Sequence, residues 1–143
     1  TRSQTVTGVQ TCALPIFGFV QIGSRVSFTS YYNLYNSAKT AASGYTAIDF
    51  SGYVPPISRI AILEVNGRCD NSGGDPRIGS DPFASDPTGV LLCHVNNNSS
   101  GSNINDGCIS DVMLTSAQVT SVRVTNNDLG LLLIQALGYT LNL

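Results

Sequence analysis

The segment Val54–Gly67, VPPISRIAILEVNG, decides the fold. A Pro-Pro pair begins it, an alternating run with two mostly apolar faces follows, and an Asn-Gly pair closes it. A strand that is apolar on both faces is typical of a sheet that is covered on two sides. The C-terminal run Leu129–Leu143, LGLLLIQALGYTLNL, has the length and apolar density of a second central strand. Together the two runs predict the core of a β-sandwich, with a turn at Asn66–Gly67.

The rest of the chain repeats short strand patterns, with turn signals about every ten residues. We expect one strand on each side of Gly23. Further strands are expected at Ala47–Phe50, Gly89–Val95, Ile109–Thr115 and Val119–Thr125. No long segment of helical period competes with them. The pattern predicts an all-β protein, a single antiparallel β-sandwich of jelly-roll type with about seven to nine strands.

Residues 1–16, TRSQTVTGVQTCALPI, resemble the translation of a common sequencing-library adapter, whose variable index would encode residues 3–5. Segments of this kind are excluded from reasoning about a fold. We therefore expect the natural domain at Phe17–Leu143, truncated at its N-terminus and preceded in the gene by an unknown sequence.

Composition narrows the classes of partner. Charged residues make up 11% of the chain, and its Lys and Arg residues are scattered singly. Nucleic-acid binding needs clustered cations that displace counterions, so we predict no nucleic-acid partner. The longest apolar run, Leu129–Leu137, is broken by Gly130 and Gln135, which predicts no membrane span. Abundant hydroxyl and amide side chains favour a virion or an extracellular, cell-surface location.

The cysteines give one candidate disulfide. Without Cys12, which belongs to the adapter-like segment, Cys69, Cys93 and Cys108 remain, and an odd number argues against a complete disulfide framework. Cys69 and Cys108 both lie in polar loops beside predicted strands, so a bridge between them is the candidate pairing. Cys93 lies inside an apolar run and is predicted to be a buried thiol.

The segment Cys69–Thr88 carries four carboxylates, from Asp70, Asp75, Asp81 and Asp86. Loop carboxylates and carbonyls can bind Ca²⁺, so these residues form a candidate binding set, although the EF-hand spacing is absent. The alternative is that the repeated Asp-Pro pairs only initiate turns, and we favour it. We therefore predict no resident cofactor or metal, with Ca²⁺ as the open exception.

Catalysis has little support in the sequence. The chain has one histidine, His94, in a strand pattern, and the adjacent Cys93 would point to the opposite face of the sheet. The same geometry argues against a zinc site, and a Gly-x-Ser-x-Gly elbow is absent. We predict a protein that is not an enzyme.

A cluster of tyrosines gives the candidate ligand surface. Tyr31, Tyr32 and Tyr35 lie close together in one predicted strand, and exposed aromatic rings are typical of glycan-binding surfaces. The same side chains could instead pack at the edge of the core or at an oligomer interface, which we favour.

Two segments resemble a known class of module. Ala47–Gly67, AIDFSGYVPPISRIAILEVNG, and Leu131–Leu141, LLLIQALGYTL, are similar to the β-sandwich modules of phage tail and virion proteins and of some bacterial surface proteins. The resemblance implies a structural or attachment module that forms a homo-oligomer and presents polar loops. The strands Ile60–Val65 and Leu131–Leu137 are apolar on both faces, so we expect the module to assemble through its apolar strands. The alternative function is a carbohydrate-binding module attached to a secreted enzyme, with a cell-surface glycan as its partner.

Overall fold

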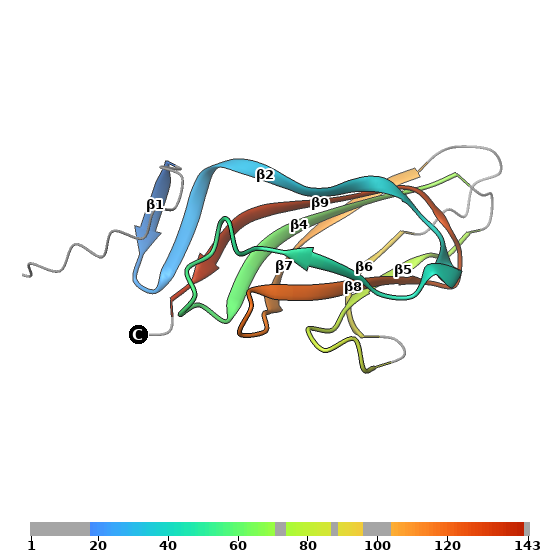
Figure 1. Ribbon diagram of the computed structural model, residues 1–143. Helices are drawn as coiled ribbons and strands as arrows, with labels where there is room; N and C mark the ends of the chain where they lie inside the picture. Colours follow the sequence, from blue (N-terminus) through green and yellow to red (C-terminus); the bar gives the residue numbers. More distant parts are fainter. Residues whose placement is uncertain (1–17, 71–73, 87–88, 96–103, 142–143) are drawn as a thin grey trace, which may run out of the picture.

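The computed structural model describes residues 18–70, 74–86, 89–95 and 104–141 (Figure 1). The adapter-like segment 1–16 lies outside these residues, as do residues 96–103 between the predicted strands Gly89–Val95 and Ile109–Thr115. The described chain forms nine β-strands and one short 3-10 turn, η1, at Ala41–Ser43. The strands are β1 (Phe19–Ile22), β2 (Arg25–Lys39), β3 (Thr46–Asp49), β4 (Ile60–Cys69), β5 (Arg77–Ser80), β6 (Val90–His94), β7 (Ile104–Met113), β8 (Val119–Thr125) and β9 (Leu129–Thr140).

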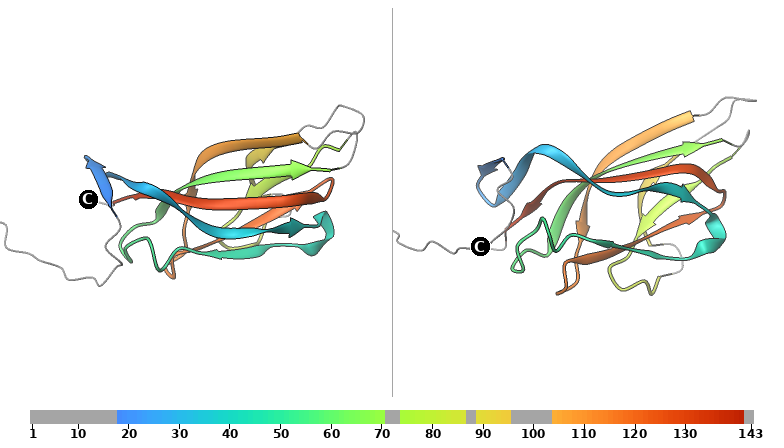
Figure 2. Two further views of the ribbon diagram at one scale, coloured as in Figure 1. Left: turned by 90° about the horizontal axis from the view of Figure 1, so that it is seen from above. Right: turned by 45° about the horizontal axis from the view of Figure 1, so that its top comes forward.

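The strands form two antiparallel sheets, which confirms the predicted β-sandwich. The first sheet has the order β1-β2-β9-β4-β7, and the second has the order β3-β8-β5-β6 (Figure 2). From β2 to β5, and again from β6 to β9, each strand lies in the opposite sheet to the one before it. This alternation is the winding of a jelly roll, in which eight strands form two facing sheets. The additional strand β1 pairs only with β2 among the described strands.

The predicted central strands lie side by side in the first sheet. β4 pairs with β9 along its length, with Val65 opposite Ile134 and Leu63 opposite Ala136. Their inward side chains pack against those of the second sheet, such as Ile78 and Val124, in one buried core. Alternation along a strand explains this, since every second side chain of β4 points between the sheets.

The turn predicted at Asn66–Gly67 is wrong, because β4 continues through both residues to Cys69. A Cβ on Gly67 would lie 2.7 Å from Cγ2 of Val95 and 3.2 Å from Cδ1 of Ile78. Glycine therefore allows the second sheet to approach β4 closely, a role that glycine has in strands as well as in turns. The strand β5, inside the Asp-Pro segment, was not predicted either.

Among the described residues, no helix has the length and apolar character needed to cross a membrane.

Candidate functional site

The Asp-Pro segment is a set of hydrogen-bonded turns in which Asp81 is central. Its Oδ1 accepts a hydrogen bond from the backbone N–H of Phe83 at 2.8 Å. Its Oδ2 accepts bonds from the N–H of Ser85 at 2.7 Å, the Ser85 hydroxyl at 3.0 Å and the N–H of Asp86 at 2.8 Å. These donors, the Asp86 and Phe83 amides above all, lower the pKa of Asp81 to about 2. The carboxylate thus fixes the turn after β5.

The other three aspartates have different neighbours. Asp70 binds Arg68, with its Oδ1 2.7 Å from Nε. Asp86 accepts the backbone N–H of Gly89 at 3.0 Å through Oδ1, while its carbonyl accepts the Tyr45 hydroxyl at 2.6 Å. In the described ranges, no three His, Cys, Asp or Glu side chains come together as a metal-binding group. The observed contacts of Asp81 and Asp86 are those of turn formers, the alternative favoured from the sequence.

Asp75 takes part in a charged cluster with His94 and Arg77. Its Oδ1 contacts Nε2 of His94, and its Oδ2 lies 3.6 Å from a guanidinium nitrogen of Arg77. The His94 hydrogen bond is the main cause that lowers the pKa of Asp75. The backbone N–H of Asp75 donates to Oδ1 of Asn127 at 2.9 Å. The cluster joins the start of β5, the end of β6 and the turn after β8.

Beside this cluster lies a cavity of about 300 Å³ on the outer face of the second sheet. The register explains the hollow, because Gly79 of β5 stands between Arg123 of β8 and Leu91 of β6 and has no side chain to fill the row. We call this cavity the Gly79 groove; it is lined by Arg77, Gly79, Gly89, Leu91, Thr125 and Asn126. Such a volume is at the lower end of the range for small-molecule sites, roughly 300–1,000 Å³.

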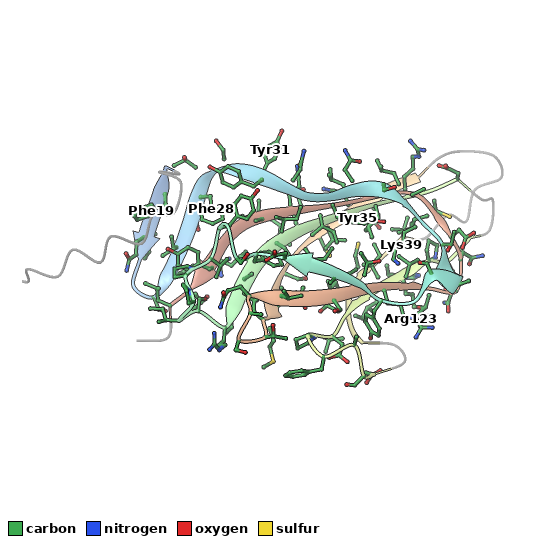
Figure 3. The ribbon with its side chains drawn as sticks, in the orientation of Figure 1. Phe19, Phe28, Tyr31, Tyr35, Lys39 and Arg123 are labelled. Carbon is green, nitrogen blue, oxygen red and sulfur yellow. The ribbon has the colours of Figure 1, made fainter. Side chains whose placement is uncertain are left out.

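The three tyrosines predicted as a ligand surface do not share one face. Tyr31 is 63% exposed, on the outer side of β2 (Figure 3). Tyr32 is partly buried against the core, where its ring lies 5.4 Å from that of Phe28 and 5.2 Å from that of Tyr53. Tyr35 also packs against the core. Packing at the core edge, the alternative favoured from the sequence, describes Tyr32 and Tyr35, and Tyr31 alone is presented to solvent.

The candidate disulfide Cys69–Cys108 is wrong for a geometric reason. In the pairing of β4 with β7, Cys69 stands opposite Ile104, whereas Cys108 stands opposite Val65. The two cysteines are thus four ladder positions apart, on the order of 13 Å at the rise of a strand. A disulfide needs Cα atoms within about 7 Å. Cys93 is buried in the core, as predicted.

The strands β6 and β7, each the last strand of its sheet on the same side of the sandwich, carry exposed apolar side chains. Val90 and Leu91 of β6 are 73% and 58% exposed, and Ile109 and Met113 of β7 are 64% and 65% exposed. We call this side of the sandwich the β6–β7 edge. A cavity of about 220 Å³ lies at it, between the two sheets, lined by Ser80, Pro82, Val90, Asp111, Val112 and Met113. Next to Pro82, Phe83 is 74% exposed.

The fold and these surfaces define a jelly-roll β-sandwich with one polar groove and one apolar edge. No protein-family model matches the chain, and no curated protein matches it.

Sequence reasoning missed both of these surfaces. The Gly79 groove depends on β5, whose four residues are hidden among turn signals. The β6–β7 edge had a signal in GVLLCHV, Gly89–Val95, which is apolar at consecutive positions. An exposed edge and a covered central strand share that pattern, so only the strand order separates them.

Proposed function

We propose that this protein is a non-enzymatic structural or attachment module of a phage virion or a bacterial surface protein, and that it assembles with further copies of itself through the β6–β7 edge. The observation that carries the proposal is that the exposed side chains of Val90 on β6 and Met113 on β7 line one cavity at this edge, with exposed Leu91 and Ile109 on the outer faces of the two sheets beside it. Exposed apolar side chains that line a shared hollow are typical of interaction sites. The resemblance of the two core segments to phage and surface modules supports the same class.

A second copy of the chain is the partner that this edge fits. β6 pairs only with β5, and β7 only with β4, among the described strands, so each offers backbone groups on its outer side. Edge strands of soluble proteins are commonly protected by charged side chains, above all lysine, or by proline. β6 contains no lysine or proline, and of the two aspartates of β7, Asp106 and Asp111, the second is paired with Arg25. An edge with apolar side chains and open backbone groups complements itself, and isologous contacts of this kind produce closed dimers.

Sedimentation velocity over a wide range of protein concentration tests the assembly. The wild-type chain should form a defined oligomer, and Met113→Lys and Val90→Lys should each weaken it at least tenfold, because they place a charge in the contact. Ile22→Lys on β1 is the matched control, since Ile22 is 79% exposed at the opposite end of the first sheet. A wild-type chain that stays monomeric at every concentration contradicts the proposal, as does an oligomer that only Ile22→Lys disrupts.

A specific observation favours carbohydrate binding as the second candidate function. The Gly79 groove places the guanidinium of Arg77 beside the Asp75 carboxylate, so a donor and an acceptor stand together. Such a pair suits two neighbouring hydroxyl groups of a sugar, while Leu91 offers an apolar wall for its C–H face. The ligand surface in this proposal is the groove, in place of the tyrosine cluster expected from the sequence.

A glycan array followed by calorimetry tests the second candidate. Arg77→Ala should reduce saccharide binding at least tenfold, because it removes the fixed donor from the groove. Tyr31→Ala is the matched control. It should leave saccharide binding unchanged, because Tyr31 lies on the other sheet. Loss of binding with Tyr31→Ala alone would move the site to β2, and an array without any signal would eliminate this function.

A further inference from the structure

Two cysteine thiols meet between the sheets at the β6–β7 edge. Cys93 of β6 stands opposite Ile78, and Cys108 of β7 stands opposite Val65, and both of these partners belong to the core. Both thiols therefore point into the sandwich, from opposite sheets. The Cys108 thiol donates to the carbonyl of Leu92, the residue before Cys93, with Sγ 2.7 Å from the oxygen. The Cys108 side chain is also close enough to Cys93 to contribute, after burial, to raising the pKa of the Cys93 thiol.

Between the described strands on this side of the sandwich, no backbone ladder joins one sheet to the other. β6 and β7 are the last described strands of their respective sheets, and they contact each other only across the layer between the sheets. The thiol pair is therefore placed where one covalent bond would join two elements that are otherwise held by side-chain packing. The third described cysteine, Cys69, lies four ladder positions from Cys108 and is separated from this pair.

We propose that Cys93 and Cys108 are a redox-active pair that oxidises to a disulfide joining the two sheets. The co-reactant is a small-molecule disulfide such as oxidised glutathione. In the first exchange, the Cys108 thiolate attacks this disulfide and releases one small thiol. In the second, the Cys93 sulfur attacks the Cys108 sulfur of the mixed disulfide and releases the other. The protein loses two protons and two electrons, and the small disulfide is reduced to two thiols.

The surroundings set the order of these two steps. Cys93 is 5% exposed, whereas Cys108 is only partly buried, so the oxidant reaches Cys108 first. Burial is the main cause that raises the pKa of Cys93 to about 12, so at neutral pH this residue is a thiol. Because thiolates carry out disulfide exchange, the second step is slow in the folded protein. Oxidation during refolding, before Cys93 is buried, is correspondingly faster.

The experiment compares the full chain refolded with oxidised glutathione and with a reductant, each then blocked with an alkylating reagent. Proteolysis before each aspartate places the four cysteines on four separate peptides, 1–48, 49–69, 86–105 and 106–110. We expect peptides 86–105 and 106–110 to be joined in the oxidised sample and separate in the reduced one. Closure of so short a loop should raise the Tm of the oxidised chain by roughly 10 °C.

Single variants make the assignment specific. Cys93→Ala and Cys108→Ser should each abolish the joined peptide and the dependence of Tm on the oxidant. Cys69→Ala is the matched control and should keep both. Cys69 joined to either cysteine, or equal Tm values with no joined peptide in the wild-type chain, would overturn the proposal. Because the wild-type comparison needs no substitution, the test stands even where a variant fails to fold.

Discussion

Arg25 of β2 and Asp111 of β7 form an ion pair across the outer face of the first sheet, with a guanidinium nitrogen 3.8 Å from Oδ1. The strands β9 and β4 lie between them in the sheet order. Ile62 of β4, directly opposite Asp111, is only 2% exposed although it belongs to the outer face. Its neighbour on β9 is Gly138, which has no side chain of its own to cover Ile62. We infer that the aliphatic stem of Arg25 covers Ile62.

Substitutions of Arg25 and Asp111 distinguish the packing of the Arg25 stem on Ile62 from the ion pair between the two charges. Arg25→Ala should lower the free energy of unfolding by about 1 kcal/mol, because it exposes part of Ile62 to water. Arg25→Met retains the apolar stem and should change it by less than about 0.5 kcal/mol. Asp111→Asn should also have a small effect, since both partners of the ion pair are half exposed. Urea denaturation measures all three, and an Asp111→Asn loss as large as that of Arg25→Ala would contradict the explanation.

Gly67 and Gly52 form a matched pair of glycine substitutions. Gly67→Ala should lower the free energy of unfolding by about 1–3 kcal/mol, because the added Cβ would lie 2.7 Å from Val95 in the packed core. Gly52→Ala should change it by less than about 0.5 kcal/mol, since no heavy atom lies within 4 Å of the position of its Cβ. Chemical denaturation of both variants tests this difference. Equal losses would mean that the sheets do not approach closely at Gly67.

Neighbouring tyrosines of β2 should differ in the same way. Tyr32→Ala should lower the free energy of unfolding by about 1–3 kcal/mol, because it removes a ring packed against Phe28 and Tyr53. Tyr31→Ala should be nearly neutral, since Tyr31 is 63% exposed. Thermal and urea unfolding of the two variants provide the measurement. A large loss for Tyr31→Ala would show that its exposed ring is covered by a partner under the conditions of the assay.

The strands that were predicted best are those whose pattern depends only on their own residues. The expected strand Val119–Thr125 coincides with β8, and Leu129 begins β9 as expected. The errors occur where the other sheet decides the conformation. Asn-Gly is a strong local turn signal. At Gly67, however, the chain continues as a strand, and the close packing of Val95 and Ile78 leaves no room for a side chain at this position.

The candidate sites were predicted less well, because they depend on which strands become neighbours. The four aspartates are close in sequence but face different partners, such as Arg68 for Asp70 and His94 for Asp75. Cys69 and Cys108 both follow polar segments, yet antiparallel pairing of β4 with β7 separates them. The approach of Cys108 to Cys93 crosses from one sheet to the other, and no local pattern in the sequence encodes it.

The dependence of Tm on pH should reveal how much the ionised Asp81 carboxylate stabilises the turn after β5. The folded-state pKa of Asp81, about 2, lies below its value of about 3.9 in an unfolded chain. A lowered carboxyl pKa contributes stability that is fully present above the unfolded value and is lost as the pH falls through the folded one. Asp81→Asn should therefore lower Tm at pH 7, and its deficit in Tm relative to wild type should shrink between about pH 4 and pH 2.

Ser85→Ala removes one of the four donors to the Asp81 carboxylate and should lower Tm at pH 7 by less than Asp81→Asn does. Scanning calorimetry at intervals of pH measures both variants, and an Asp81→Asn deficit that stays constant down to pH 2 would show that the turn does not depend on the carboxylate charge.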